Sequence, residues 1–122
     1  MKPAEVGRRG EDLACKLLKK RKYKVLERNV RGHYGEIDIV ARQGDCTVFV
    51  EVRTRTSDEY GTPEESITPR KRKKLVACAL DYIGQHDKLR DAPWRIDVVG
   101  IELDQDGLPS RADIIESAVP LF

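Results

Sequence analysis

The segment 34–55 constrains the fold of this 122-residue chain more than any other. It contains two stretches, 34–43 and 46–55, in which apolar and polar residues alternate, and the dipeptide Gly44-Asp45 separates them. Alternation with a period of two is typical of a strand with one buried face, and a glycine-aspartate pair is typical of a two-residue hairpin turn. We therefore expect two antiparallel strands joined by a tight turn.

The two faces of this hairpin differ chemically. Counted back from a two-residue turn, one face is apolar and needs a covering helix; it consists of Ile37, Ile39, Ala41, Val48, Val50 and Val52. On the other face Asp38 lies opposite Glu51, with the Cβ atoms about 5 Å apart, and Glu36 lies opposite Arg53. A three-residue turn would instead move Asp38 to the apolar face.

The carboxylates of Asp38 and Glu51 should repel each other in this arrangement. Carboxylate oxygens suit Mg²⁺ or Mn²⁺, so a divalent cation bound between them would remove the repulsion. The alternative interpretation is a solvated network in which Glu36 and Glu51 share Arg53. Asp38 and Glu51 both stand between apolar neighbours within their strands, where charge is usually avoided, and this favours the metal site.

Two helices and three further strands are predicted around the hairpin. Apolar residues spaced by 3.6 positions predict the helices, one over 5–22 and one that begins at Pro69 with the apolar stripe Leu75, Val76, Ala79, Leu80 and Ile83. Runs of strand-forming residues predict the strands, which cover 23–30, 94–103 and 112–116. No repeat or linker interrupts the chain, so we expect one domain over 1–122 with the order α-β-β-β-α-β.

Basic residues gather in the run 70–74, at the start of the second predicted helix. This end of a helix disfavours positive charge, so contacts with phosphate groups offer an explanation. Lys71 precedes the apolar Leu75 by one turn and therefore leans toward the core. A solvated charged face is the alternative. The residues that we expect to bind a nucleic-acid backbone are Arg8, Arg9, Arg55, Arg70, Lys71 and Lys74.

Two further acidic residues are candidates for the same site. Glu11 borders the apolar stripe of the first helix and would reach the sheet from there, unless it is only a favourable charge near the helix N-terminus. Asp97 shares one strand face with Arg95, so it is either a further ligand or half of a buried ion pair.

Composition excludes several classes of protein. The 23 Lys and Arg against 21 Asp and Glu leave a net charge of +2, so any attraction to nucleic acid must come from local clusters. The longest apolar run, 75–80, is far shorter than the roughly 20 residues of a membrane-spanning helix, so we expect no membrane association. Without an apolar leader at the N-terminus, we expect the cytoplasm. Phosphate-loop and dinucleotide-binding motifs are also absent from the sequence.

The residues GEID at 35–38 and EVR at 51–53 resemble the D-x(n)-E-x-K signature of the restriction-endonuclease-like PD-(D/E)XK superfamily of nucleases. A wider pattern over about residues 7–103 resembles the uncharacterised bacterial YraN-type family. Besides the two motifs, the matching residues are Gly7 to Glu11, Tyr23, Asn29, Arg31, Phe49, Val50, Gly61, Pro63, Glu64, Lys71, Arg95 and Asp97.

This resemblance has consequences for fold and chemistry. Kinship with archaeal Holliday-junction resolvases implies an αβββαβ core with a mixed central sheet flanked by helices, a DNA partner and a homodimer. It also implies Mg²⁺ or Mn²⁺ at Asp38 and Glu51, joined by the Val52 carbonyl, with Glu11 taking part. One position departs from the signature, because Arg53 stands where a lysine is expected. Arginine keeps its proton and cannot act as a general base, although it can hold a phosphate.

Three hypotheses follow from these observations. The first is a metal-dependent nuclease of branched or structured DNA that uses Asp38, Glu51, Arg53 and Glu11 in catalysis. The second is a nucleic-acid-binding module that has the fold but does not cleave, and Arg53 is the feature that favours it. The third is a structural interaction domain in which the carboxylates only form ion pairs.

Overall fold

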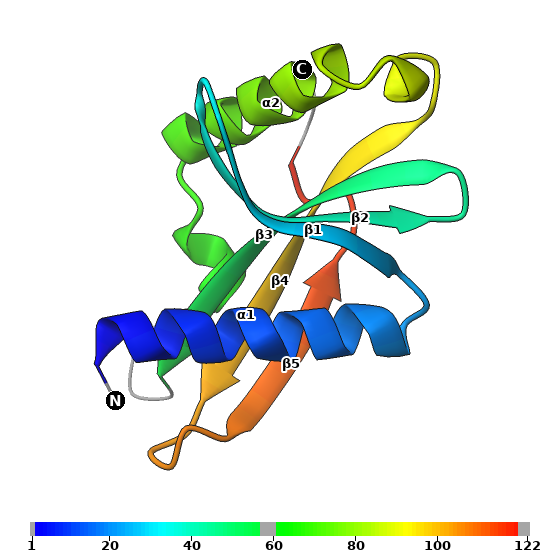
Figure 1. Cartoon of the computed structure of the whole chain (residues 1–122). Coiled ribbons are helices and arrows are strands. Elements are labelled where there is room, and N and C mark those ends of the chain that lie inside the picture. The colour runs from blue at the N-terminus through cyan, green and yellow to red at the C-terminus, as the bar shows by residue number, and fades with distance from the viewer. Residues whose placement is uncertain (1, 57–60, 120–122) are drawn as a thin grey trace.

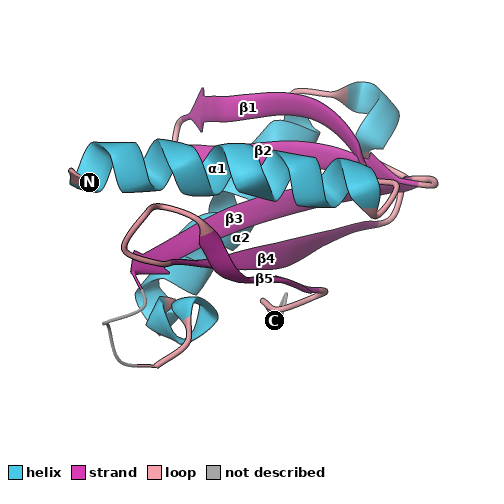
Figure 2. Cartoon of the chain, turned by 90° about the horizontal axis from the view of Figure 1, so that it is seen from below, coloured by secondary structure: helices cyan, strands magenta, loops and turns pink. Residues whose placement is uncertain are grey.

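The computed structural model describes residues 2–56 and 61–119. Within these residues a five-stranded sheet lies between two α-helices (Figures 1 and 2), and neither helix is both long and apolar enough to cross a membrane. The elements are α1 (Pro3–Lys20), β1 (Lys24–Gly32), β2 (Gly35–Gln43), β3 (Cys46–Thr56), the 3₁₀ turn η1 (Pro63–Ser66), α2 (Pro69–Gly84), the 3₁₀ turn η2 (Asp87–Leu89), β4 (Trp94–Leu103) and β5 (Pro109–Ile115).

The predicted order α-β-β-β-α-β is confirmed, with β5 added at the sheet edge. The strands lie side by side in chain order, and the sheet is mixed because β3 and β4 are parallel while the other neighbours are antiparallel. A parallel pair needs a crossover connection, and α2 lies within this one. The strand predicted at 112–116 begins earlier, at Pro109, because an edge strand tolerates a proline at its first residue.

Each face of the sheet carries its own apolar core. The core under α1 contains Ala14 and Leu18 of the helix with Ile39 and Val50 of the hairpin, as the alternation predicts. The core under α2 contains Phe49 and partners on the opposite face of the sheet. Figure 2 shows α1 in front of the sheet and α2 behind it. Asp38 and Glu51 therefore lie between two covered faces rather than on an open one.

Three side chains lie on a different face from the one that the sequence predicts. The first is Asp38, which is expected on the face of Glu51 and lies instead on the side of the sheet that α1 covers. Leu80 is 54% exposed, and the buried positions of α2 are Leu75, Cys78, Ala79, Tyr82 and Ile83, so the stripe turns away from Leu80. Ile37 packs in the core under α2, although its parity with Ile39 predicts the face under α1. Ile37 is on the other face because β2 separates from β3 before Ile39 and pairs there with β1 alone.

The hairpin opens at its far end. From Gln43 and Cys46 to Ile39 and Val50 the paired residues follow the register of a two-residue turn, and Gly44 has the left-handed φ of +61° that such a turn needs. Beyond Ile39 and Val50 the two described strands no longer pair, because β2 continues with β1 while β3 continues with β4. This opening is the place where Asp38 lies.

Candidate functional site

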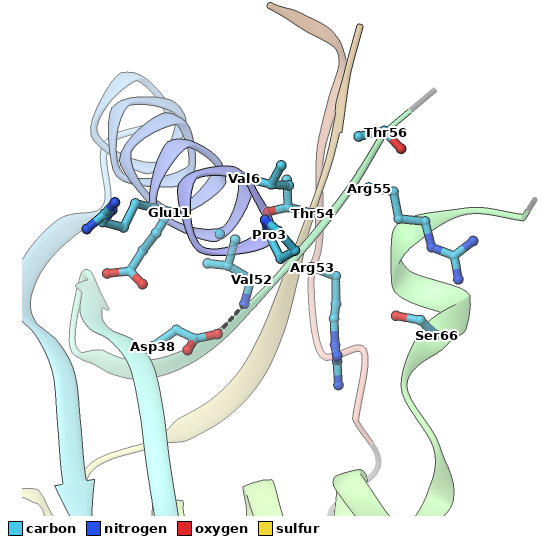
Figure 3. A pocket seen from close by; sticks show the side chains of 12 residues that line it. Pro3, Val6, Glu11, Asp38, Val52, Arg53, Thr54, Arg55, Thr56 and Ser66 are labelled. Atoms are coloured by element: carbon cyan, nitrogen blue, oxygen red, sulfur yellow. Dashed lines mark hydrogen bonds between the residues drawn. The ribbon is translucent and has the colours of Figure 1, made fainter. Parts of the chain in front are cut away.

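Asp38 fills the opening between β2 and β3. Its Oδ2 accepts a hydrogen bond of 2.8 Å from the backbone N–H of Val52, as the dashed line in Figure 3 shows. A side-chain oxygen thus replaces the backbone carbonyl that an uninterrupted ladder would supply. The N–H and C=O of one strand residue point to the same edge, so the Val52 carbonyl also faces this opening.

Glu51 approaches Asp38 from the α2 side of the sheet and is 4% exposed. Its Oε2 lies 3.2 Å from Nη2 of Arg53 and 3.5 Å from Nζ of Lys71. A buried carboxylate needs such partners, since leaving one unpaired costs several kcal/mol in order of magnitude. Glu36 pairs with Arg31 at 3.9 Å, and its predicted position opposite Arg53 is wrong because β2 has left β3 there.

The two carboxyl groups interact strongly. Burial, followed by the negative charge of Glu51 and a hydrogen bond between the two carboxyl groups, raises the pKa of Asp38 to about 7 from its ordinary 3.8. The Val52 N–H and the Lys71 ammonium lower it only in part. The predicted proximity of these carboxylates is therefore present.

Asp38 opens onto a pocket of about 700 Å³ between α1, the end of β3 and η1 (Figure 3). The pocket is lined by Pro3, Val6, Gly7, Arg8, Glu11, Asp38, Val52, Arg53, Thr54, Arg55, Thr56 and Ser66. The pocket thus combines arginines from α1 and β3 with the acidic side chains Glu11 and Asp38. Glu51 and Lys71 are not among its lining residues and meet Asp38 from behind the sheet.

Glu11 points from α1 toward the same pocket as Asp38 (Figure 3). Its Oε1 accepts two hydrogen bonds of 3.0 Å, one from Nε of Arg28 and one from Nδ2 of Asn29. Glu11 lies well beyond the first turn of α1, which begins at Pro3, so a favourable interaction with the helix N-terminus does not explain it. Asn29, whose φ is +53°, stands between the β1 residues that pair with the neighbours of Asp38.

The remaining cations divide into three groups. Arg8 and Arg55 line the pocket, whereas Arg9 turns away and donates from Nε to the carbonyl of Gly107 at 3.2 Å. Arg70 and Lys74 are exposed on the first turns of α2. Of the five consecutive cations at 70–74, all described, only Lys71 is not exposed, as its predicted lean toward the core requires.

Asp97 is part of a buried ion pair at the other end of β4. It is fully buried and accepts hydrogen bonds from Nε of Arg95 at 2.9 Å, the hydroxyl of Tyr23 at 3.0 Å and the N–H of Ser117 at 2.9 Å. These bonds satisfy its carboxylate without a metal, and Asp97 is not among the residues that line the pocket. The ion-pair interpretation of Asp97 therefore holds.

The donor set suits a hard divalent cation. Asp38 and Glu51 offer carboxylate oxygens and Val52 a carbonyl oxygen, the ligand types that Mg²⁺ and Mn²⁺ prefer. Among the described residues no three His, Cys, Asp or Glu side chains form a group that could hold a metal. Water and substrate oxygens would therefore complete the coordination, as is usual for Mg²⁺.

Several residues near the site were not predicted. Arg28 and Asn29 hold Glu11, and Ser66 lines the pocket from η1. Arg28 and Asn29 reach the site through contacts between α1 and β1, and Ser66 reaches it from η1. Alternation within the hairpin carries no information on such contacts, although the family pattern does include Asn29.

Comparison with known proteins places the chain in a family. The model of the uncharacterised protein family UPF0102 matches residues 10–101. A UPF0102 protein of Dehalococcoides mccartyi is 44% identical over 94% of this chain and 93% of its own length. The corresponding values are 45%, 92% and 92% for one of Moorella thermoacetica, and 49%, 77% and 76% for one of Roseiflexus castenholzii. The resemblance to the YraN-type family is confirmed, and the chain belongs to the UPF0102 family.

Proposed function

We propose that this protein binds DNA and hydrolyses phosphodiester bonds in branched or structured DNA, with Mg²⁺ or Mn²⁺ as cofactor. The observation that carries the proposal is the pair Asp38 and Glu51, whose carboxyl groups meet where the hairpin opens onto a pocket lined by arginines. An ion pair alone would lower the pKa of Asp38, whereas this pKa is raised to about 7. Strongly shifted carboxyl groups in a pocket are typical of functional sites.

Asp38, Glu51 and the Val52 carbonyl would hold the cation, which supplies an activated water and a positive charge at the scissile phosphate. Arg53, whose buried Nε has no hydrogen-bond partner among the described residues, would bind a phosphate oxygen. Glu11, held by Arg28 and Asn29, offers an acceptor that orients water in the pocket.

In the reaction, the oxygen of water forms a bond to phosphorus and the bond from phosphorus to one ester oxygen breaks. One proton of that water ends on the departing alcohol, and the other stays on the new phosphate monoester or passes to solvent. Arg8 and Arg55 would hold flanking phosphates of the same strand at the pocket.

A cleavage assay tests this proposal. Junction, flap, single-stranded and duplex DNA are incubated with the full chain in Mg²⁺ and in Mn²⁺, with Asp38→Ala as the inactive control. We expect cleavage of at least one branched substrate by the wild type, and none by the variant. Equal products from both proteins would point to a contaminating nuclease, and binding without cleavage would contradict the nuclease proposal.

A second candidate is a DNA-binding module that does not cleave. It is favoured by the fact that Oε2 of Glu51 already lies beside Arg53 and Lys71, so two cations of the chain itself neutralise the carboxylate. In that case DNA affinity should not respond to Mn²⁺. The same substrates, titrated with and without Mn²⁺, distinguish the two candidates.

A further inference from the structure

Two cations from different elements share one oxygen of Glu51. Arg53 comes from the same strand, two residues later, and lies 3.2 Å away. Lys71 comes from the start of α2 and lies 3.5 Å away. The superfamily signature has its lysine at the position that Arg53 occupies, and none is expected at the start of α2. The structure therefore has a lysine next to the glutamate, although it is not the one in the motif.

The place of Lys71 is fixed by its surroundings. Thr68 is the N-cap of α2, and its Oγ1 accepts a hydrogen bond of 3.1 Å from the Lys71 N–H. Leu75 and Cys78, one and two turns further along the helix, are buried in the core. The Lys71 side chain is 33% exposed, so its stem runs along covered surface while its ammonium reaches Glu51.

The start of α2 is an unfavourable place for this charge. The first turn of the helix contains no acidic residue that would offset the macrodipole. Glu51, on the face of the sheet that α2 covers, supplies the compensating negative charge, and the Lys71 ammonium also acts on Asp38. Lys71 thus pairs with one of the carboxylates that would hold the metal and acts electrostatically on the other.

We propose that Lys71 is the lysine of the catalytic site, contributed by α2 instead of by the motif position that Arg53 occupies. This inference rests on the proposed function. The ammonium would donate to an oxygen of the attacked phosphate and stabilise the negative charge that develops as water adds to phosphorus. A lysine provides a compact charge for this task, whereas the planar fork of Arg53 suits the holding of a phosphate.

Relocating the lysine tests the inference. Lys71→Met retains the length of the stem and removes the charge, and we expect kcat to fall about 100-fold while KM for DNA changes far less. The double variant Lys71→Met with Arg53→Lys should recover at least about tenfold of that loss, because a lysine then stands at the motif position. Lys71→Arg should stay impaired. Lys88→Met, at an exposed residue beyond the other end of α2, is the matched control and should cleave like the wild type.

The competing explanation is an ion pair that only neutralises Glu51. Lys71→Arg would then be as active as the wild type, and this result would overturn the inference while the proposed function stands. The same conclusion would follow if Lys71→Met cleaved normally. A wild type that cleaves no substrate would overturn the proposed function instead, and the inference with it.

Metal affinity provides a readout that does not depend on turnover. Lys71→Met removes one of the two cations beside Oε2 of Glu51 and with it a positive charge that repels the metal, so this variant should bind Mn²⁺ severalfold more tightly than the wild type in calorimetry. Lys88→Met should bind it with unchanged affinity. Thermal unfolding of each variant checks that it folds. An Mn²⁺ affinity unaffected by Lys71→Met in a folded protein would count against a position of Lys71 at the metal site.

Discussion

The ionisation of Asp38 depends strongly on the fold. Its pKa is about 7 in the folded chain against an ordinary 3.8, so between these values the folded state holds a proton that the unfolded state has lost. The stabilising effect of this proton is complete below the unfolded pKa and disappears as pH rises through the folded pKa. Above it, the folded protein carries the repulsion between Asp38 and Glu51.

Asp38→Asn should therefore stabilise the protein at alkaline pH. The amide oxygen can still accept the Val52 N–H, while the charge is gone. We expect a gain of about 1–2 kcal/mol at roughly pH 8, less than the full shift implies because the site is partly hydrated, and almost none at roughly pH 4. Thermal unfolding at both pH values measures it. A variant less stable than the wild type at the higher pH would show that the hydrogen bond to Val52 outweighs the repulsion.

Glu51 offers the direct test of the metal site. Glu51→Gln removes one of the two carboxylates, so calorimetric titration should show Mn²⁺ affinity at least about tenfold weaker than that of the wild type. Glu36→Gln is the matched control, since Glu36 lies on the neighbouring strand, pairs with Arg31 and takes no part in the site. Equal affinities in all three proteins would exclude a metal at Glu51.

Sequence reasoning found the residues of the hairpin but not all their partners. The turn type fixes the register as far as Ile39 and Val50, and the carboxyl groups of Asp38 and Glu51 meet just beyond it, where the strands separate. The ion pair of Lys71 with Glu51 and the two donors to Glu11 join segments far apart in the chain. Such contacts depend on how each helix is rotated and shifted on the sheet, and periodicity does not give that information.

At the level of elements, the extent of the strands was predictable and the opening of the hairpin was not. Alternation and turn residues define strands one at a time. The separation of β2 from β3 instead reflects competition, because β2 follows β1 and β3 follows β4 beyond Ile39 and Val50. The same separation turns Ile37 to the other core and exposes the Val52 N–H to the side chain of Asp38.

The seating of α1 on the sheet depends on Gly10. A Cβ atom at this position would lie 1.8 Å from Oγ1 and 2.8 Å from Cβ of Thr54, so the helix can approach β3 only without a side chain there. Gly10→Ala should lower the free energy of unfolding by about 1–2 kcal/mol, because overpacking exceeds the gain in helix propensity. It should also shift Glu11, the next residue.

Gly7 provides the matched control in the same helix. A Cβ atom at Gly7 has no atom within 4 Å, so Gly7→Ala should stabilise the protein by up to about 1 kcal/mol through helix propensity alone. Chemical denaturation of both variants measures the difference. Similar stability changes for the two alanines would show that α1 is free to move away from Thr54.

On the scale of the whole molecule, the site draws on both layers that cover the sheet. α1 brings Glu11 and Arg8 to one face, and α2 brings Lys71 to the other. Asp38 can interact with groups from both layers because its strand leaves β3 at that point. The site, which consists of the pocket and the ion pairs of Glu51, thus depends on two helices that are separated along the chain by the hairpin, and so it forms only when the fold is complete.

The distribution of charge leads to the last prediction. With a net charge of +2, attraction to DNA must come from the cations around the pocket and the start of α2. Replacing Arg70 and Lys74 together by alanine should reduce the slope of log affinity against log salt by about one unit for each DNA phosphate that the variant no longer neutralises. Both residues are exposed, and neither is the cation beside Glu51.

A second double variant separates local binding from overall charge. Arg21→Ala with Lys88→Ala removes one arginine and one lysine at exposed positions, one just after α1 and one beyond the far end of α2. Its net charge equals that of the first double variant, so an effect of charge alone would change both salt slopes equally. We expect the slope of this control to remain close to that of the wild type in fluorescence anisotropy. Equal changes in the two variants would mean that Arg70 and Lys74 belong to a solvated helix face.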